Sequence, residues 1–148
     1  MSFPNYKYGS GLSNVGSYQV SGKPYTEKIV SPASASNGST VPVKVEFPFV
    51  TKEIVIPNAA GTSHQLVRVA FSELGVRNEI GNYFLIGSMK DGNGATTLDV
   101  KATELYVMSD DNHTADVTVY ASLTGIPVER IANISPSGSN WSGSAGIG

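Results

Sequence analysis

The stretch Thr97–Pro127, TLDVKATELYVMSDDNHTADVTVYASLTGIP, carries the clearest strand pattern in the chain. Apolar and polar residues alternate along it with the two-residue period of a half-buried strand. The apolar positions are Leu98, Val100, Ala102, Leu105, Val107, Val117, Val119, Ala121 and Leu123. Between Ala102 and Leu105 the apolar set moves by one residue, which predicts a β-bulge or a sharp bend at Thr103–Glu104. Because the polar run Ser109–His113 has turn chemistry, the stretch predicts a long antiparallel hairpin.

Shorter strand patterns precede this hairpin and are separated by residues that favour turns. They cover Tyr25–Val30, Val41–Phe47, Val50–Ile56, Leu66–Phe71 (with Arg68 on its polar face) and Asn82–Ile86. Ser72–Gly81 has room for one helical turn at most, and Val128–Ile134 predicts a turn or two of helix after Pro127. About seven to eight antiparallel strands without long helices between them indicate an all-β fold, a single β-sandwich with jelly-roll-like order.

Length and composition describe one globular domain with an unusual surface. A chain of 148 residues is long enough for one self-sufficient core. Only 15% of the residues are charged, against about a quarter in an average soluble domain, so we expect part of the surface to be covered by a partner. The formal net charge of −2 and the scattered basic residues argue against binding to nucleic acid. Cysteine is absent, which excludes disulfides and thiolate metal sites.

The sequence carries no targeting signal that we can identify. Its first residues, MSFPNYKYGSG, contain no apolar run typical of a signal peptide, and no segment approaches the length of a membrane span. We therefore expect synthesis in a cytoplasm and no membrane partner.

Both ends of the chain have the composition of extended arms around a body at residues 25–127. Residues 1–24 combine small and polar residues with single aromatics, and residues 128–148 are rich in Gly and Ser. Aromatic side chains supply much of the energy at protein contacts. The predicted contact residues are Phe3, Tyr6, Tyr8, Tyr18, Tyr25 and Trp141. For Tyr18 and Tyr25, packing against the chain's own body is the alternative.

The search for chemistry gives no catalytic, cofactor or metal site. His64 and His113 both lie in polar loop sequence, and no Gly-x-Ser-x-Gly motif presents a serine. His113 lies among Asp110, Asp111 and Asp116, but such a group at a hairpin tip is usually a solvated turn. We therefore expect a protein that is not an enzyme.

Three segments resemble small virion structural proteins of tailed bacteriophages, in particular those of marine and cyanobacterial phages. They are GLSNVGSYQVSGKPY at residues 11–25, VKVEFPFV at residues 43–50, and YASLTGIP at residues 120–127 followed by Arg130. The resemblance covers roughly Gly11–Arg130 and implies a structural component of the particle. It implies a head-decoration (cement or knob-like) protein on the capsid surface, bound to the major capsid protein and other virion proteins.

These features lead to one functional expectation and two alternatives. We expect a phage capsid decoration protein that forms a symmetric homo-oligomer, such as a trimer, and stabilises the head. A tail- or fibre-associated virion protein is the nearest alternative. The other is a carbohydrate-binding β-sandwich for attachment to the host surface, with Tyr83, Tyr106, Tyr120 and Trp141 as candidate stacking residues.

Overall fold

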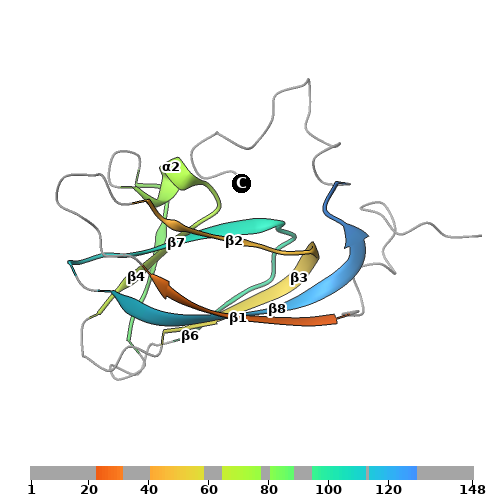
Figure 1. Cartoon of the computed structure of the whole chain (residues 1–148), viewed down its shortest axis with the longest axis horizontal. Coiled ribbons are helices and arrows are strands. Elements are labelled where there is room, and N and C mark those ends of the chain that lie inside the picture. Colours follow the sequence, from red (N-terminus) through yellow and green to blue (C-terminus); the bar gives the residue numbers. More distant parts are fainter. Residues whose placement is uncertain are drawn as a thin grey trace, which may run out of the picture.

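The computed structural model describes residues 23–31, 41–58, 65–77, 81–88, 95–112 and 114–129. This part of the chain is a β-sandwich with one short helix (Figure 1). The elements are β1 (Lys23–Ser31), β2 (Val43–Glu46), β3 (Phe49–Pro57), β4 (Val67–Ala70), α2 (Glu73–Val76), β5 (Phe84–Ile86), β6 (Ala95–Leu98), β7 (Glu104–Ser109) and β8 (Ala115–Pro127). Most of the helix predicted at Val128–Ile134 lies outside the described residues. No helix in the described part is long and apolar enough to cross a membrane.

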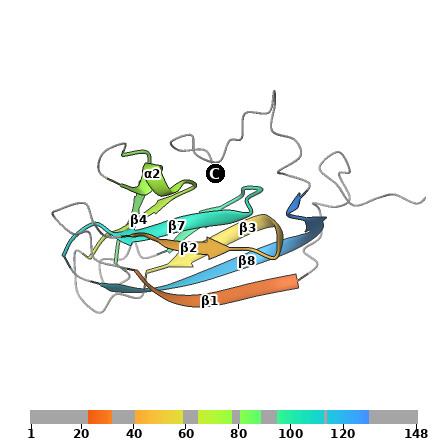
Figure 2. The same cartoon turned by 45° about the horizontal axis from the view of Figure 1, so that its top comes forward.

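The strands form two four-stranded antiparallel sheets that lie one on the other (Figures 1 and 2). Sheet A has the order β1-β8-β3-β6, and sheet B has the order β2-β7-β4-β5. β1 therefore pairs with β8, β2 with β7, β3 with β6, and β4 with β5. This is the pattern of a long antiparallel pair rolled up into two layers, which is a jelly roll. The predicted all-β sandwich is confirmed.

The long hairpin predicted over Thr97–Pro127 is wrong. Its two main strands, β7 and β8, follow each other in the chain but belong to different sheets. β7 pairs with β2 and β4, and β8 pairs with β1 and β3. The alternation correctly predicts that Leu105 and Val107 of β7 and the alternate residues of β8 point inward, although Met108 on the outer side of β7 is buried as well. The alternation contains no information about which strand lies beside it, and here β7 and β8 lie in different sheets instead of forming a hairpin.

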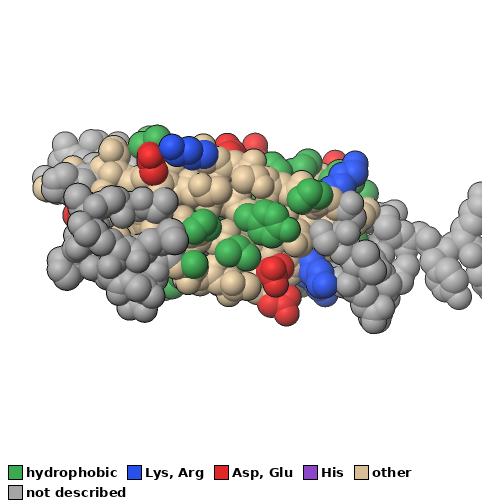
Figure 3. Space-filling view, turned by 90° about the horizontal axis from the view of Figure 1, so that it is seen from below, with side chains coloured by type: hydrophobic (Ala, Val, Ile, Leu, Met, Phe, Trp, Pro, Cys, Tyr) green, Lys and Arg blue, Asp and Glu red, His purple; other side chains and the backbone are tan. Residues whose placement is uncertain are grey.

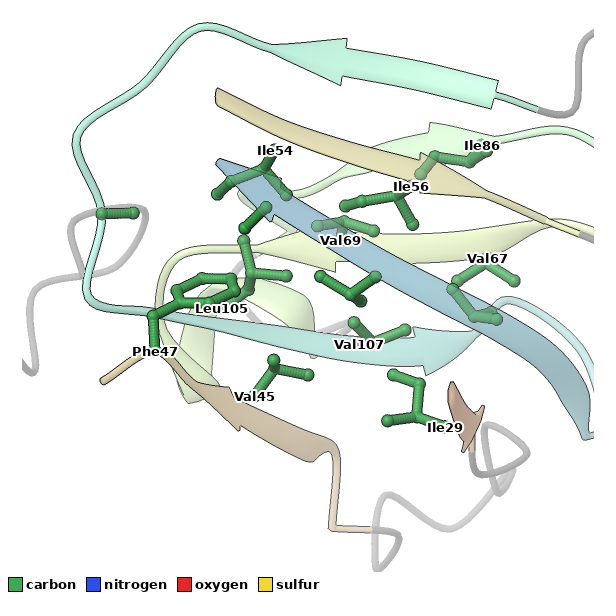
Figure 4. Packing of buried hydrophobic residues seen from close by; sticks show 14 of the residues in the cluster. Ile29, Val45, Phe47, Ile54, Ile56, Val67, Val69, Ile86, Leu105 and Val107 are labelled. Carbon is green, nitrogen blue, oxygen red and sulfur yellow. The ribbon is translucent and has the colours of Figure 1, made fainter. Parts of the chain in front are cut away.

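The core lies between the inner faces of the two sheets and is almost purely aliphatic (Figure 4). Ile54 and Ile56 of sheet A are fully buried, as are Leu105 and Val107 of sheet B. The core also contains Ile29, Val45, Phe47, Val67, Val69, Ile86, Ala102, Ala115, Val117, Val119, Ala121 and Leu123. Each fully buried aliphatic side chain contributes about 1.5–3 kcal/mol of transfer free energy, so this layer is the main source of stability.

The segment from Leu98 to Glu104 carries the chain from sheet A to sheet B, and one buried hydroxyl fixes it. The Thr51 side chain, which is fully buried, donates to the Val100 carbonyl at 2.7 Å and accepts from the Ala102 N–H at 2.9 Å. The predicted bend is present at Thr103, directly before β7 begins. The one-residue shift in the apolar pattern therefore marks a change of sheet.

Part of the outer face of sheet B, over β4 and β7, is covered by a short helix of the chain. The one-turn helix α2 places Val76 against Ala70 of β4 and Met108 of β7, with Tyr83 and Tyr106 packed at the margin. The Ser72 hydroxyl caps the helix by accepting from the Gly75 N–H at 3.0 Å. Ser72–Gly81 is predicted as a loop with room for one helical turn at most, and α2 is a single turn within that limit; it forms a small second core.

A buried ion pair lies beside this second core. Arg68 of β4 is only 4% exposed, and its Nε lies 2.6 Å from Oδ1 of Asp110. The ring of Tyr83 lies over the guanidinium group, with 4.7 Å between Cζ and the ring centroid. Arg68 therefore lies on the outer face of β4, as predicted, but there it is covered by Tyr83 and forms an ion pair with Asp110.

Candidate functional site

Of the six predicted contact residues, only Tyr25 lies in the part of the chain that the structure describes. The other five, Phe3, Tyr6, Tyr8, Tyr18 and Trp141, lie outside the described residues. We therefore describe the candidate site at the end of the sandwich where the two predicted arms begin.

Both predicted arms join the sandwich at the same end of sheet A, which we call the arm end. β1 begins at Lys23 and β8 ends at Pro127, and these two strands are antiparallel neighbours. Lys23 lies opposite Leu123, only four residues before the end of β8. Figure 1 shows the start of β1 and the end of β8 on the same side of the molecule. β1 also includes Lys23 and Pro24, so the strand begins two residues earlier than the predicted body.

Aromatic contacts hold the arm end together. The Lys23 ammonium group lies 5.2 Å from the centroid of the Phe49 ring, and Phe49 lies opposite Pro127 in the register of β3 and β8. The rings of Tyr25 and Phe47 meet edge to face with 5.4 Å between centroids. Cation–π contacts and edge-to-face pairs each contribute about 0.5–1.5 kcal/mol. Tyr25 thus packs against its own body, the alternative that the sequence left open.

An irregular register between β3 and β8 shapes the same end of the sheet. The pairing shifts between Phe49 and Thr51 and again between Thr51 and Glu53. The buried Thr124 hydroxyl donates to the Val50 carbonyl at 2.7 Å and accepts from the Ile126 N–H at 3.2 Å. The sequence does not single out Thr124, because nothing distinguishes this residue from the polar residues that alternate along the strand. Bulges bend a strand and raise its twist, so they set the direction in which the chain leaves sheet A.

The pKa of Tyr25 predicts a loss of stability at high pH. Burial and the hydrogen bond that its hydroxyl donates to Glu27 raise the Tyr25 pKa to about 12, from 10.0. Between about pH 10 and pH 12 the unfolded chain therefore loses this proton while the folded chain keeps it. The Tyr25 contribution to folding is complete below pH 10 and is lost as the pH rises through 12.

We expect the thermal unfolding midpoint of the wild type to fall more steeply between pH 10 and pH 12 than that of Tyr25→Phe. Calorimetry of both proteins at pH 8, 10, 11 and 12 measures this difference, and pH 8 is the reference at which only the lost hydrogen bond separates them. Parallel curves above pH 10 would contradict the assignment.

Two of the acidic residues near the predicted hairpin tip form ion pairs with basic side chains of the protein. Asp110 pairs with Arg68, and Asp116 pairs with Lys28 at 3.1 Å. Within the described residues, no group of three His, Asp or Glu side chains could hold a metal ion. His113 and His64 lie outside the described residues.

The candidate stacking tyrosines lie on opposite sides of the sandwich. Tyr83 and Tyr106 are half-buried in the second core on the outer face of sheet B, where Tyr83 covers Arg68. Tyr120 lies on the outer face of sheet A and is 37% exposed. Tyr83, Tyr106 and Tyr120 therefore do not form one stacking surface.

Comparisons of this chain with protein-family models, with curated proteins and with solved structures found no match.

Proposed function

We propose that this chain is a structural subunit of a tailed-phage virion, a head decoration protein that binds the lattice of the major capsid protein. The resemblance of its Gly11–Arg130 region to small phage virion proteins supports the proposal. A jelly roll is also an architecture that viral capsid domains use, although it hosts lectins and other proteins as well.

The arm end is the observation that carries the proposal. Residues 1–22 precede β1 and residues 128–148 follow the end of β8, so both predicted arms are attached side by side. A neighbour that contacts one arm close to the sandwich is therefore within reach of the other. Ordering an arm costs conformational entropy, and a permanent contact in an assembly can offset that cost.

The edges of the sheets favour association through arms and faces over extension of a sheet. β1 has the longest free edge among the described strands, and long free edges invite pairing with other chains. It carries Lys23, Pro24 and Lys28, and Glu27 lies on its inner face opposite Val119. Charges, prolines and inward-pointing charged residues are the devices that block edge pairing. The other free edges, β2, β5 and β6, have four residues or fewer.

The test is the number and position of copies in the particle, together with rebinding. We expect a high copy number on the head and saturable binding of the purified protein to shells that lack it. A low copy number and a position at the tail would instead identify the protein as a tail or fibre component. Shells that take up none of the purified protein would refute a decoration role.

A carbohydrate-binding function is the second candidate, because Tyr120 lies exposed among hydroxyl-bearing residues. Thr26 lies directly opposite Tyr120 on β1, and Thr118 and Ser122 flank it on β8. Glycan-array binding by the wild type, abolished in Tyr120→Ala, would favour this function. If the wild type bound no glycan on the array, the carbohydrate-binding function would be excluded.

A further inference from the structure

We propose that the outer face of sheet A is the docking surface, and that its occupant is a flat, weakly charged surface of a protein larger than this sandwich. This inference rests on the proposed function and adds to it the face that makes the contact. Four observations carry it: the composition of the face, the covering of the opposite face, the distribution of charge, and the area available.

The centre of this face is a row of uncharged side chains that crosses all four strands. Tyr120 of β8 lies opposite Thr26 of β1 and opposite Val55 of β3, and Val55 lies opposite Thr97 of β6. Figure 3 views the molecule from the sheet A side and shows hydrophobic side chains in the middle of the face, with acidic and basic side chains beside them and along the margin. A tyrosine among apolar and hydroxyl groups offers contact area and hydrogen bonds, as interface centres do.

The two outer faces of the sandwich differ in what covers them. The face of sheet B carries α2 and the second core around Val76 and Met108. No described element lies over the row through Tyr120, which remains 37% exposed. Sheet A is also the sheet that contains both β1 and β8, so the arm end lies at the border of its face. The exposed face and both arm attachments therefore belong to the same layer.

The charges near this row nearly cancel. Lys28 and Asp116 pair with each other at 3.1 Å, and Glu53 lies opposite Ser122 in the next row toward the arm end. A nucleic acid requires clustered cations, which this face does not offer within the described residues. The face therefore fits a protein surface without strong charge.

The area of the face argues for a large partner rather than a second copy packed face to face. β1 and β3 have nine residues each, β8 has thirteen and β6 has four. At about 3.3 Å per residue and about 4.8 Å between strands they cover roughly 550 Å². Stable complexes bury about 800 Å² on each partner. The remaining area has to lie outside this face, and the chain enters β1 and leaves β8 at one end of this sheet. A partner that extends past the sandwich can contact both the face and the arms.

Binding of charge variants to shells that lack the protein tests the inference. Tyr120→Arg and Thr97→Arg place a cation in the central row on β8 and on β6. Leu85→Arg is the matched control, because Leu85 is 46% exposed on an edge strand of sheet B. Thermal melts select variants that fold as the wild type does. We expect each face variant to weaken shell binding at least tenfold and the control to bind within twofold of the wild type.

The possible outcomes separate this inference from the proposed function. Wild-type binding that both face variants retain would overturn the docking face and leave the decoration role standing. Shells that bind no wild-type protein would overturn both. A wild-type dimer that Tyr120→Arg dissociates in sedimentation would assign the face to a second copy, and glycan binding lost in the same variant would assign it to carbohydrate. Either result overturns the inference.

Discussion

Replacing Thr51 by Val is expected to lower the free energy of unfolding by about 3 kcal/mol. Val has nearly the same shape, so the substitution removes the hydroxyl without opening a cavity. The Val100 carbonyl and the Ala102 N–H then lose their partner at the crossing between the sheets. Each buried backbone group left without a hydrogen bond costs about 1–3 kcal/mol. Urea unfolding followed by circular dichroism measures the loss.

Two controls show whether the hydroxyl is responsible. Thr51→Ser keeps the hydroxyl and removes one methyl group, so we expect it to cost about 1 kcal/mol. Thr118→Val makes the same chemical change on the outer face of sheet A and should cost less than about 0.5 kcal/mol. Equal losses for Thr51→Val and Thr51→Ser would show that packing, and not the hydrogen bonds, sets the effect.

Replacing Asp110 by Asn is expected to cost about 3 kcal/mol, because it leaves the Arg68 guanidinium group buried without its counter-charge. The Arg68 side chain is only 5% exposed and the Asp110 side chain 30%, so the guanidinium group has little access to water once the carboxylate is gone. The Tyr83 ring stays in place but supplies only a weak attraction to the cation. The loss is measured by urea unfolding at pH 7.

The exposed pair of Lys28 and Asp116 provides the matched control. Its side chains are 67% and 52% exposed, so Asp116→Asn should change stability by about 0.5 kcal/mol or less. In the double variant Arg68→Met, Asp110→Asn the buried charge is gone, and we expect recovery of most of the loss. A single variant Asp110→Asn as stable as the wild type would mean that Arg68 finds water or another partner.

These variants lie where local sequence patterns gave least information. Alternation along β7 and β8 correctly placed Leu105, Val107 and Val119 in the core, because a strand with one buried face has a two-residue period. Thr51 and Arg68 occupy positions that the same pattern treats as ordinary polar sites. Only contact with distant segments buries them, Thr51 against the crossing to β7 and Arg68 against Asp110 and Tyr83.

The chain's sequence by itself determined the fold class, most of the inward-facing residues, the limit of one helical turn in Ser72–Gly81 and the bend at Thr103. Each of these depends on local periodicity, on turn residues or on helix propensity. The tertiary structure alone decided that β7 and β8 lie in different sheets and that β1 lies beside β8. Strand pairing depends on the packing of whole sheets and on long-range closure, which a local pattern does not encode. That pairing brings Lys23 and Pro127 to one end of sheet A, and with them the two segments on which the proposed function depends.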